Sequence, residues 1–258
     1  MRAHFGGSSR KSLVASRVSL DAAVKGVDAN SASALSSELF FVADVLSTNI
    51  AVRRALTDPS RDGKAKAAFI SELFGKKVGA VALGLVTELS SLRWSAPKDL
   101  VLVLEQLAIE AEASAANIAG ELDRVEDEIF TAAAAFASST ELRKALTSDA
   151  TNAKATLVAD ILKGASGSTV KLVSQMVNAW RGRSIESAFA DYQAALAARR
   201  NRVIALVRVA APLSQAQQDR LATTLTSKVG QPVRINIEID PTVLGGVSVK
   251  FADEIVDG

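Results

Sequence analysis

Cysteine is absent from the 258 residues of this chain, and histidine occurs once, as His4. Without cysteine the chain has no disulfides and no thiolate chemistry, which is typical of a reducing compartment. A single histidine beside the amino terminus excludes Ser-His-Asp and Cys-His sites, and it leaves the body of the protein without the most common general base. The sequence therefore gives no support to nucleophilic or imidazole-dependent catalysis, and we expect no catalytic residues.

Long apolar runs and a strong charge of one sign are also missing. No apolar run approaches the roughly 18–20 residues that cross a bilayer, and no apolar segment follows the basic residues of Met1–Lys11 to form a secretion signal. Lys and Arg number 30 against 28 Asp and Glu, a net charge of +2. This balance is too weak for a nucleic-acid footprint. We expect a soluble, cytoplasmic protein that meets a membrane only through a partner.

Aromatic residues make up 5% of the chain while apolar residues make up 48%, so the cores are mostly Ala, Leu and Val. Through the first 200 residues apolar side chains recur at helical spacing. Asn30 and Ser31 are suitable N-cap residues for one of these helices. From Pro97 onward an apolar seam predicts one helix of about forty residues, roughly 60 Å long, over residues 97–137. Gly120 is the weak point of this helix, where a bend or break would fall.

The helical part of the sequence repeats itself. Arg53-Arg54-Ala55-Leu56-Thr57 returns 90 positions later as Arg143-Lys144-Ala145-Leu146-Thr147, and Lys66-Ala67 returns 88 positions later as Lys154-Ala155. An ordered series of such matches indicates an internal duplication of a helical module of about 90 residues. We predict a first module over residues 1–110 and a second over 111–202, with the long helix closing one and opening the other.

The last segment changes to a period of two residues. Val203–Val209 and Val233–Ile239 alternate apolar and polar residues, and Val247–Phe251 does so again after a turn at Gly245-Gly246. Between the first two lies a helix that opens with the capping box Ser214-x-x-Gln217. The predicted fold is mainly α, with two related helical-bundle modules sharing a long helix, followed by a small α+β domain, a β-α-β-β unit over residues 203–258.

Three patterns invite a functional interpretation. Gly245-Gly246 lies between strands and lacks the residues of a phosphate-binding loop, so we interpret it as a turn. Five carboxylates on the long helix have no histidine partner, and we interpret them as a solvated acidic face, with a docking surface as the alternative. A basic stretch near the end of the second module is interpreted as solvated. The acidic residues are Glu121, Asp123, Glu126, Asp127 and Glu128, and the basic residues are Arg181, Arg183, Arg199, Arg200 and Arg202.

The carboxyl-terminal motifs resemble the signature of the ATP synthase delta subunit, the family that includes the mitochondrial oligomycin sensitivity conferral protein. The resemblance is carried by Pro212-Leu213-Ser214-x-x-Gln217, by Asp240-Pro241-x-x-x-Gly245-Gly246 and by the ending Val256-Asp257-Gly258. The motif residues Asp240, Pro241, Gly245, Gly246, Asp257 and Gly258 are implied to be structural. The additional helical module is similar to that of the long delta subunits of actinobacteria.

The resemblance implies a non-catalytic subunit of the peripheral stalk of the F-type ATP synthase, without a cofactor or metal. Its implied partners are the amino-terminal helices of the alpha subunit and the carboxyl-terminal region of subunit b, on the cytoplasmic face of a bacterial plasma membrane. We expect an alpha helix to bind a groove of the first module. Apolar positions expected to be spare from the core, and therefore candidates for the groove, are Phe69, Ile70, Phe74 and Val78.

Two other classes of function stay open at this point. One is a helical binding adaptor unrelated to ATP synthesis, such as a weak nucleic-acid-binding protein, which would show steeply salt-dependent binding to duplex DNA. The other is an enzyme with an unrecognised carboxylate site, for which Asp123 and Asp127 would be the residues to change.

Overall fold

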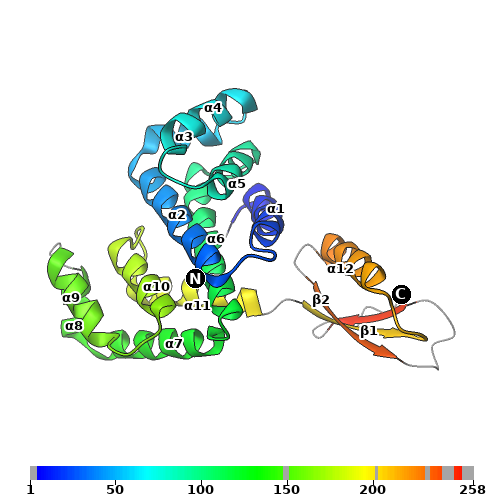
Figure 1. Cartoon of the computed structure of the whole chain (residues 1–258). Coiled ribbons are helices and arrows are strands. Elements are labelled where there is room, and N and C mark those ends of the chain that lie inside the picture. Colours follow the sequence, from blue (N-terminus) through cyan, green and yellow to red (C-terminus); the bar gives the residue numbers. More distant parts are fainter. Residues whose placement is uncertain (1–4, 148–150, 201–202, 230–232, 240–246, 252–258) are drawn as a thin grey trace. The chain divides into compact units, whose positions relative to one another are not determined.

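A computed structural model describes residues 5–147, 151–200, 203–229, 233–239 and 247–251 (Figure 1). The chain divides into two compact units, Met1–Arg199 and Arg200–Gly258, which are considered one at a time. The described residues are mainly helical, as the spacing of apolar residues predicts. The helices of the first unit are α1 (Gly7–Ala23), α2 (Ala29–Thr48), α3 (Ile50–Thr57), α4 (Gly63–Phe74), α5 (Ala80–Ser91), α6 (Pro97–Ile118), α7 (Leu122–Ser138), α8 (Thr140–Thr147), α9 (Thr151–Ile161), α10 (Gly167–Asn178) and α11 (Ile185–Arg200).

Helix α6 is the centre of the first unit. It begins at Pro97, the residue predicted to open the helix, because a first-turn proline gives up no hydrogen bond. From Asp99 to Ala116 the helix is buried at most positions on every side, and α2 lies along much of its length while α1, α3, α7 and α10 also contact it. A helix enclosed in this way fixes the positions of its neighbours.

The prediction of a single helix over residues 97–137 is wrong, because the helix breaks at Gly120. Gly120 adopts a φ of 73°, a left-handed conformation that glycine enters without a Cβ clash. The Glu121 N–H donates to the Ala116 carbonyl (2.8 Å) and the Gly120 N–H to the Asn117 carbonyl (3.2 Å), which is the pattern of a Schellman C-cap. Apolar spacing continues across the break because both α6 and α7 bury a face in the same core.

Helices α2 to α6 and helices α7 to α11 each run in the succession long, short, medium, medium, long. The first five contain 20, 8, 12, 12 and 22 residues, and the second five contain 17, 8, 11, 12 and 16. The pattern of burial also matches. Leu39 and Leu46 of α2 are fully buried, and so are Ile129 and Phe136, which lie 90 positions later in α7.

One polar contact recurs in both sets of helices. The Glu38 carboxylate of α2 accepts a hydrogen bond from the N–H of Gly79, the N-cap of α5 (2.8 Å). Glu128 of α7 accepts from the N–H of Ser166, the N-cap of α10 (2.9 Å). In each set a carboxylate from one helix therefore satisfies a free N–H at the start of another, where the helix dipole also favours negative charge.

The second unit contains a three-stranded sheet and one helix. The strands are β1 (Val203–Val209), β2 (Val233–Ile239) and β3 (Val247–Phe251), in the order β2-β1-β3, with β2 parallel and β3 antiparallel to β1. Helix α12 (Gln215–Val229) packs on the sheet through a small core that includes Val207, Val209 and Leu225. The predicted capping box is present, because Ser214 N–H donates to Gln217 Oε1 (2.8 Å) and Gln217 N–H to Ser214 Oγ (3.4 Å).

Candidate partner-binding faces

Four carboxylates of the central helix α6 are buried in the first unit. Asp99 in its first turn accepts a hydrogen bond from the Ser9 hydroxyl (2.7 Å), and the other three lie in later turns. Glu105, Glu110 and Glu112 are each 2% exposed. A buried carboxylate is costly unless cations and hydrogen bonds compensate for its lost hydration. Each of the three is compensated by residues that come from other helices of the unit, so each links α6 to a neighbour.

Glu105 is held by two arginines that follow α10. Arg183 Nη2 lies 2.7 Å from Glu105 Oε1 and Arg181 Nε lies 3.4 Å from it, while the Tyr192 hydroxyl donates to the same oxygen (3.3 Å). Arg181 also reaches Asp44 of α2 at 2.7 Å. Its φ of 51° is a left-handed conformation that costs a non-glycine residue on the order of 1 kcal/mol. The backbone at Arg181 is thus strained, and the ion pairs with α2 and α6 compensate.

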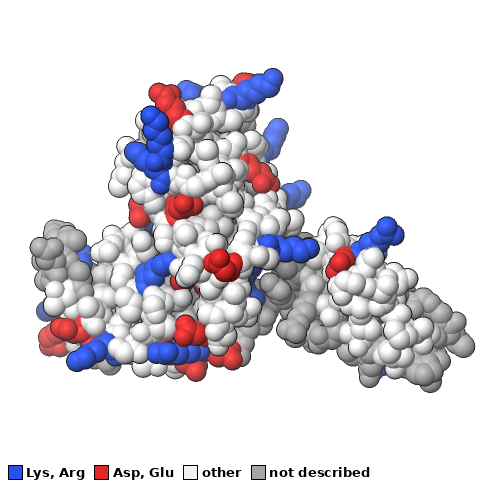
Figure 2. Space-filling view, viewed as in Figure 1, with Lys and Arg blue, Asp and Glu red and all other residues white. Residues whose placement is uncertain are grey.

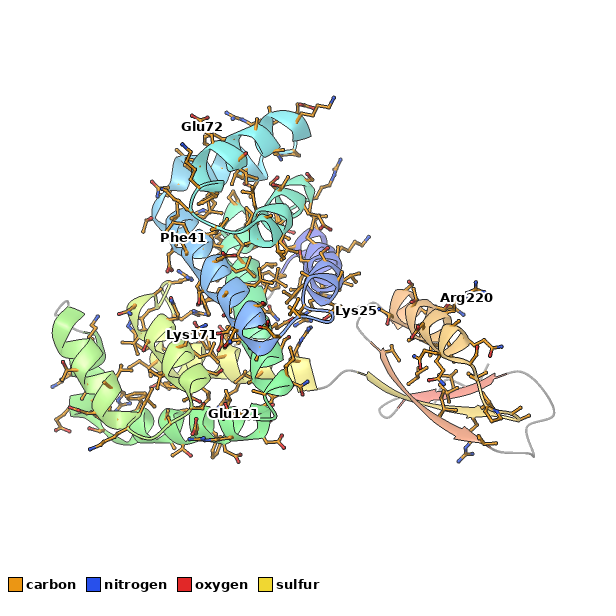
Figure 3. The ribbon with its side chains drawn as sticks, in the orientation of Figure 1. Lys25, Phe41, Glu72, Glu121, Lys171 and Arg220 are labelled. Carbon is orange, nitrogen blue, oxygen red and sulfur yellow. The ribbon has the colours of Figure 1, made fainter. Side chains whose placement is uncertain are left out.

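Glu112 joins three helices at one point. Lys171 of α10 contacts Glu112 Oε2 (2.9 Å) and also donates to the carbonyl (2.9 Å) and hydroxyl of Ser33 in α2. Ser33 and Ser168 donate their hydroxyls to the Glu112 carboxylate at 3.0 Å and 2.7 Å. Figure 3 shows Lys171 where α10 meets α2 and α6. This cluster ties α2, from the first five helices, to α10, from the second five.

Glu110 and Arg199 are two further internal charges. Arg17 of α1 pairs with Glu110 at 2.6 Å. Burial raises the pKa of Glu110, while the charge and the hydrogen bonds of Arg17 act in the opposite direction. Arg199 of α11 donates to Ser114 (2.7 Å) and pairs with Asp21. The first and last helices of the unit are therefore both fastened to α6.

These contacts correct the interpretation of the basic stretch as solvated. The side chains of Arg181, Arg183 and Arg199 are 5%, 11% and 6% exposed. Arg181 and Arg183 are buried because Glu105, which they neutralise, lies on an enclosed helix, and Arg199 is buried where it reaches Ser114 of the same helix. Apolar periodicity alone does not place charged residues inside. On the face shown in Figure 2 the surface charges of both signs are interspersed and form no single basic field.

The residues predicted to line a groove in the first module are largely in its core. Ile70 and Phe74 are 0% and 1% exposed and Val78 is 9% exposed, while Phe69 is partly buried against the same core. The expectation that these four are spare from the core is wrong for Ile70, Phe74 and Val78. α4 and α5 pack together, and the aromatic ring of Phe74 also makes an edge contact with Phe41 of α2.

Exposed apolar residues occur on α1 and α5, two helices that contact each other. Val18 of α1 and Val81 of α5 are 48% and 52% exposed. Gly84 of α5 is exposed, and a Cβ added there would meet no atom within 4 Å. The Ser19 hydroxyl joins the two helices by donating to Glu88 (2.5 Å). We call Val18, Val81 and Gly84 the α1/α5 face.

A second exposed apolar position lies on α7. Phe130 is 68% exposed, the highest value among the large apolar side chains of the described residues. Asp127 and Ala134, one helical turn to either side of it, are exposed as well, and so is Asp123 one turn further. We call Asp123, Asp127, Phe130 and Ala134 the outer face of α7.

The acidic residues expected on a solvated face do not all behave alike. Asp123 and Asp127 are exposed, but Glu128 points to the start of α10. Partial burial opposes its charged form, yet hydrogen bonds from Thr169, Ser166 and Arg124 lower the pKa of Glu128 to about 2. Among the residues that the structure describes, no group of three or more acidic or histidine side chains is placed to hold a metal ion.

Two further observations concern the described residues only. None of their helices is by itself long and apolar enough to span a membrane, although α2 and α3, bent by 107° where they meet, pass that test together. The motif residues Asp240, Pro241, Gly245, Gly246, Asp257 and Gly258 lie outside the described residues, so their predicted structural role stays a prediction.

Comparison with known proteins agrees with the resemblance seen in the motifs. The model of the ATP synthase delta (OSCP) subunit family matches residues 110–258. An ATP synthase subunit delta of Streptomyces coelicolor is 42% identical over 255 residues, covering 98% of this chain and 93% of the relative. Proteins of the same name from Kineococcus radiotolerans and Thermobifida fusca are each 38% identical, covering 98% and 94% of this chain and 92% and 93% of the relatives.

Proposed function

The chain belongs to the ATP synthase delta (OSCP) family, and from that premise we propose that it is a stator subunit of the peripheral stalk. In this role it joins the catalytic head of a proton-translocating F-type ATP synthase to subunit b. Proton flow turns the rotor, and the head must be held still for rotation to drive synthesis. The part required is a stiff connector with partner surfaces, and no reaction centre is needed.

The observation that best supports this proposal is the enclosed helix α6 with its charged links. Glu105, Glu110 and Glu112 are each paired with a cation from outside α6 at 2.6–2.9 Å. Buried ion pairs add little net stability compared with an apolar core, but removing one partner is costly, so they favour one arrangement over alternatives. A connector that transmits torque needs such resistance to rearrangement.

We further propose that the first unit contains two copies of one module, in support of the division at residues 1–110 and 111–202. The matched helix lengths, the matched buried positions and the repeated N-cap contacts of Glu38 and Glu128 all support a duplication. The shared helix α6 closes the first copy, and the Schellman turn at Gly120 opens the second. Residues 203–258 would form the third part, a β-α-β-β domain.

The α1/α5 face is our proposed site for an amino-terminal helix of the alpha subunit. Exposed Val18 and Val81 supply apolar contacts, and Gly84 leaves room for a helix to approach closely. A glycine inside a helix is destabilising by roughly 0.5–1 kcal/mol relative to alanine. Since none of the described residues would meet a Cβ added at Gly84, close approach of a partner gives a physical reason for this glycine.

Subunit b is the proposed partner of the carboxyl-terminal domain together with the adjoining module. Membrane contact would come only through the assembled complex, at the cytoplasmic face of the plasma membrane. The adaptor alternative is less well supported, because Arg181, Arg183 and Arg199 are buried in internal ion pairs and are not displayed to a nucleic acid.

The alpha-binding proposal is tested by titrating a peptide from the alpha amino terminus onto the full chain. We expect micromolar binding, a loss of at least tenfold with Val81→Asp, and little change with Ile50→Asp. Ile50 is a matched control because it is 54% exposed on α3, against 52% for Val81. Equal binding by both variants would place the peptide elsewhere, and no binding by the unaltered chain would count against the proposed function.

A further inference from the structure

Helices α5 and α10 hold equivalent places in the two proposed modules, and their residues correspond at an offset of 87. The N-cap of α5, Gly79, matches the N-cap of α10, Ser166. Every residue that α5 buries also matches a residue that α10 buries. These are Ala82, Leu85, Val86, Leu89 and Ser90 of α5, and Thr169, Leu172, Val173, Met176 and Val177 of α10. The two helices therefore turn the same face to the core.

The exposure of the two helices differs along one other side. Val81, Gly84 and Glu88 of α5 are exposed, whereas their counterparts in α10 are half-buried. The spacing of three and four residues places the three positions on one side of each helix. The counterparts are Ser168, Lys171 and Gln175. Helix α10 is thus covered along the side that α5 leaves open.

Contacts with α6 and α2 account for this cover. Ser168 donates its hydroxyl to Glu112 of α6 (2.7 Å), and Lys171 pairs with the same carboxylate (2.9 Å). Helix α6 precedes α7 as α1 precedes α2, so the contact of α10 with α6 corresponds to that of α5 with α1. The additional neighbour is α2, which lies along α6 and whose Ser33 carbonyl accepts from Lys171 (2.9 Å).

Two contacts show the direction in which α2 runs past α10. Ser33, near the start of α2, meets Lys171 in the first half of α10. Asp44, near the end of α2, pairs at 2.7 Å with Arg181, which follows α10. Ser33 and Asp44 are about 16 Å apart along α2, at 1.5 Å per residue. Helices α2 and α10 therefore lie side by side and run in the same direction.

The first module has its own counterpart of Arg181. Arg93 stands four residues before α6, which begins at Pro97, and Arg181 stands four residues before α11, which begins at Ile185. Arg93 is exposed, whereas the side chain of Arg181 is 5% exposed and paired with α2. The first module thus presents the same cation at the same end of its open side.

We propose that α2 occupies, on the second module, the face that the first module leaves open, so that the chain binds one alpha-subunit helix and not two. This inference rests on the proposed stator function and adds the module, the direction and the charge of that contact. The bound helix lies on the α1/α5 face and runs parallel to α5, as α2 runs parallel to α10. It presents a carboxylate near its carboxyl end to Arg93, as Asp44 does to Arg181.

The number of sites is measured by calorimetric titration of the full chain with a peptide from the alpha amino terminus. We expect one peptide for each chain, because α2 closes the second module to a further helix. Binding of two peptides overturns this inference and leaves the stator function standing. No binding at all overturns the proposed function on which the inference is built.

The direction is tested by disulfide exchange, because the chain has no cysteine of its own. Ala80→Cys and Ser91→Cys place one thiol at either end of α5, on exposed positions. We expect a peptide with an amino-terminal cysteine to cross-link at least fivefold faster to Ala80→Cys. A peptide with a carboxyl-terminal cysteine should prefer Ser91→Cys by a similar factor. The reverse preference, or equal rates, overturns the parallel arrangement.

The charge of the contact is tested with Arg93→Glu, which should weaken binding of the peptide at least fivefold. Arg54→Glu, also on an exposed position, is the matched control and should bind as the unaltered chain does. Replacing the peptide carboxylate that meets Arg93 by lysine should restore binding to Arg93→Glu. Equal binding by the two variants overturns the predicted ion pair.

Discussion

Gly84 of α5 and Lys171 of α10 stand at the same place in two matching helices, one residue before a buried Leu-Val pair. Gly84 faces open space, whereas Lys171 is fastened to Glu112 and Ser33. The pair Phe40 and Phe130 shows the opposite, because Phe40 of α2 is buried and its counterpart Phe130 of α7 is exposed. The two sets of helices share the same buried face, while their surface residues differ according to what lies against them. In both pairs, the residue that is exposed in one set of helices corresponds to a residue that makes contacts in the other set.

The largest effect on stability is expected for Phe40 and Phe130, the counterparts that differ most in exposure. Phe40→Ala should lower the free energy of unfolding by about 4 kcal/mol, because it removes a buried aromatic ring from a packed interface. Phe130→Ala in the isolated chain should change it by less than about 0.5 kcal/mol, since the ring is exposed. Urea denaturation of both variants measures the difference. Similar losses of stability in the two variants would mean that α2 and α7 are packed alike, which would contradict the difference in burial between Phe40 and Phe130.

Glu105→Gln should have the next largest effect, a loss of about 3 kcal/mol. The change keeps the side-chain shape but leaves Arg181 and Arg183 buried with less compensating charge. Asp44 and Asp191 still pair with these arginines, which places the loss at the lower end of the range for broken buried pairs. Glu72→Gln on the exposed face of α4 is the control, and urea unfolding is again the measurement. An unchanged midpoint would show that α6 does not depend on its internal charges.

Apolar spacing in the sequence predicted the helical character because each helix buries one face, and that face repeats every three or four residues. That pattern is least complete in α1, because much of the face that α1 buries consists of Ser9, Ser12 and Ser16. It also favoured Asn30 and Ser31 as N-caps, whereas Asp28 caps α2 by accepting from the Ser31 N–H (2.7 Å). Hydroxyls and carboxylates act through specific partners, and a hydropathy pattern carries no information about partners.

The candidate sites were harder to predict for the same reason. Ile70 and Phe74 looked available because the sequence does not show which helices surround α4. Nothing in the sequence singles out Glu105, Glu110 and Glu112, because their cations are distant in the sequence. The exposure of Phe130 cannot be predicted from the sequence either, because its counterpart Phe40 is the same residue type and is buried. The repeated motifs in the sequence did supply the alignment of α2 with α7, at an offset of 90 residues.

The smallest expected effect is a difference in the pH dependence of stability between the two N-cap contacts, those of Glu128 and Glu38. Glu128 has a folded pKa of about 2, below its ordinary value of 4.5. Its contribution to stability is therefore fully present above about pH 5 and is lost as the pH falls toward 2. Because the carboxylate is partly solvated, we expect this contribution to be on the order of 1 kcal/mol. Glu128→Gln should be less stable than the unaltered chain at pH 6, and the difference should shrink by pH 2.5.

Glu38→Gln is the matched control in the first module. Among the described residues Glu38 accepts only from the Gly79 N–H, whereas Glu128 also accepts from the Ser166 hydroxyl at 2.8 Å and pairs with Arg124 at 2.8 Å. The pH-dependent loss should therefore be larger for Glu128→Gln, as measured by urea unfolding across that pH range. An equal pH dependence in both variants would show that the N–H contact alone sets the effect, and that the two modules differ at their outer faces but not at this shared joint.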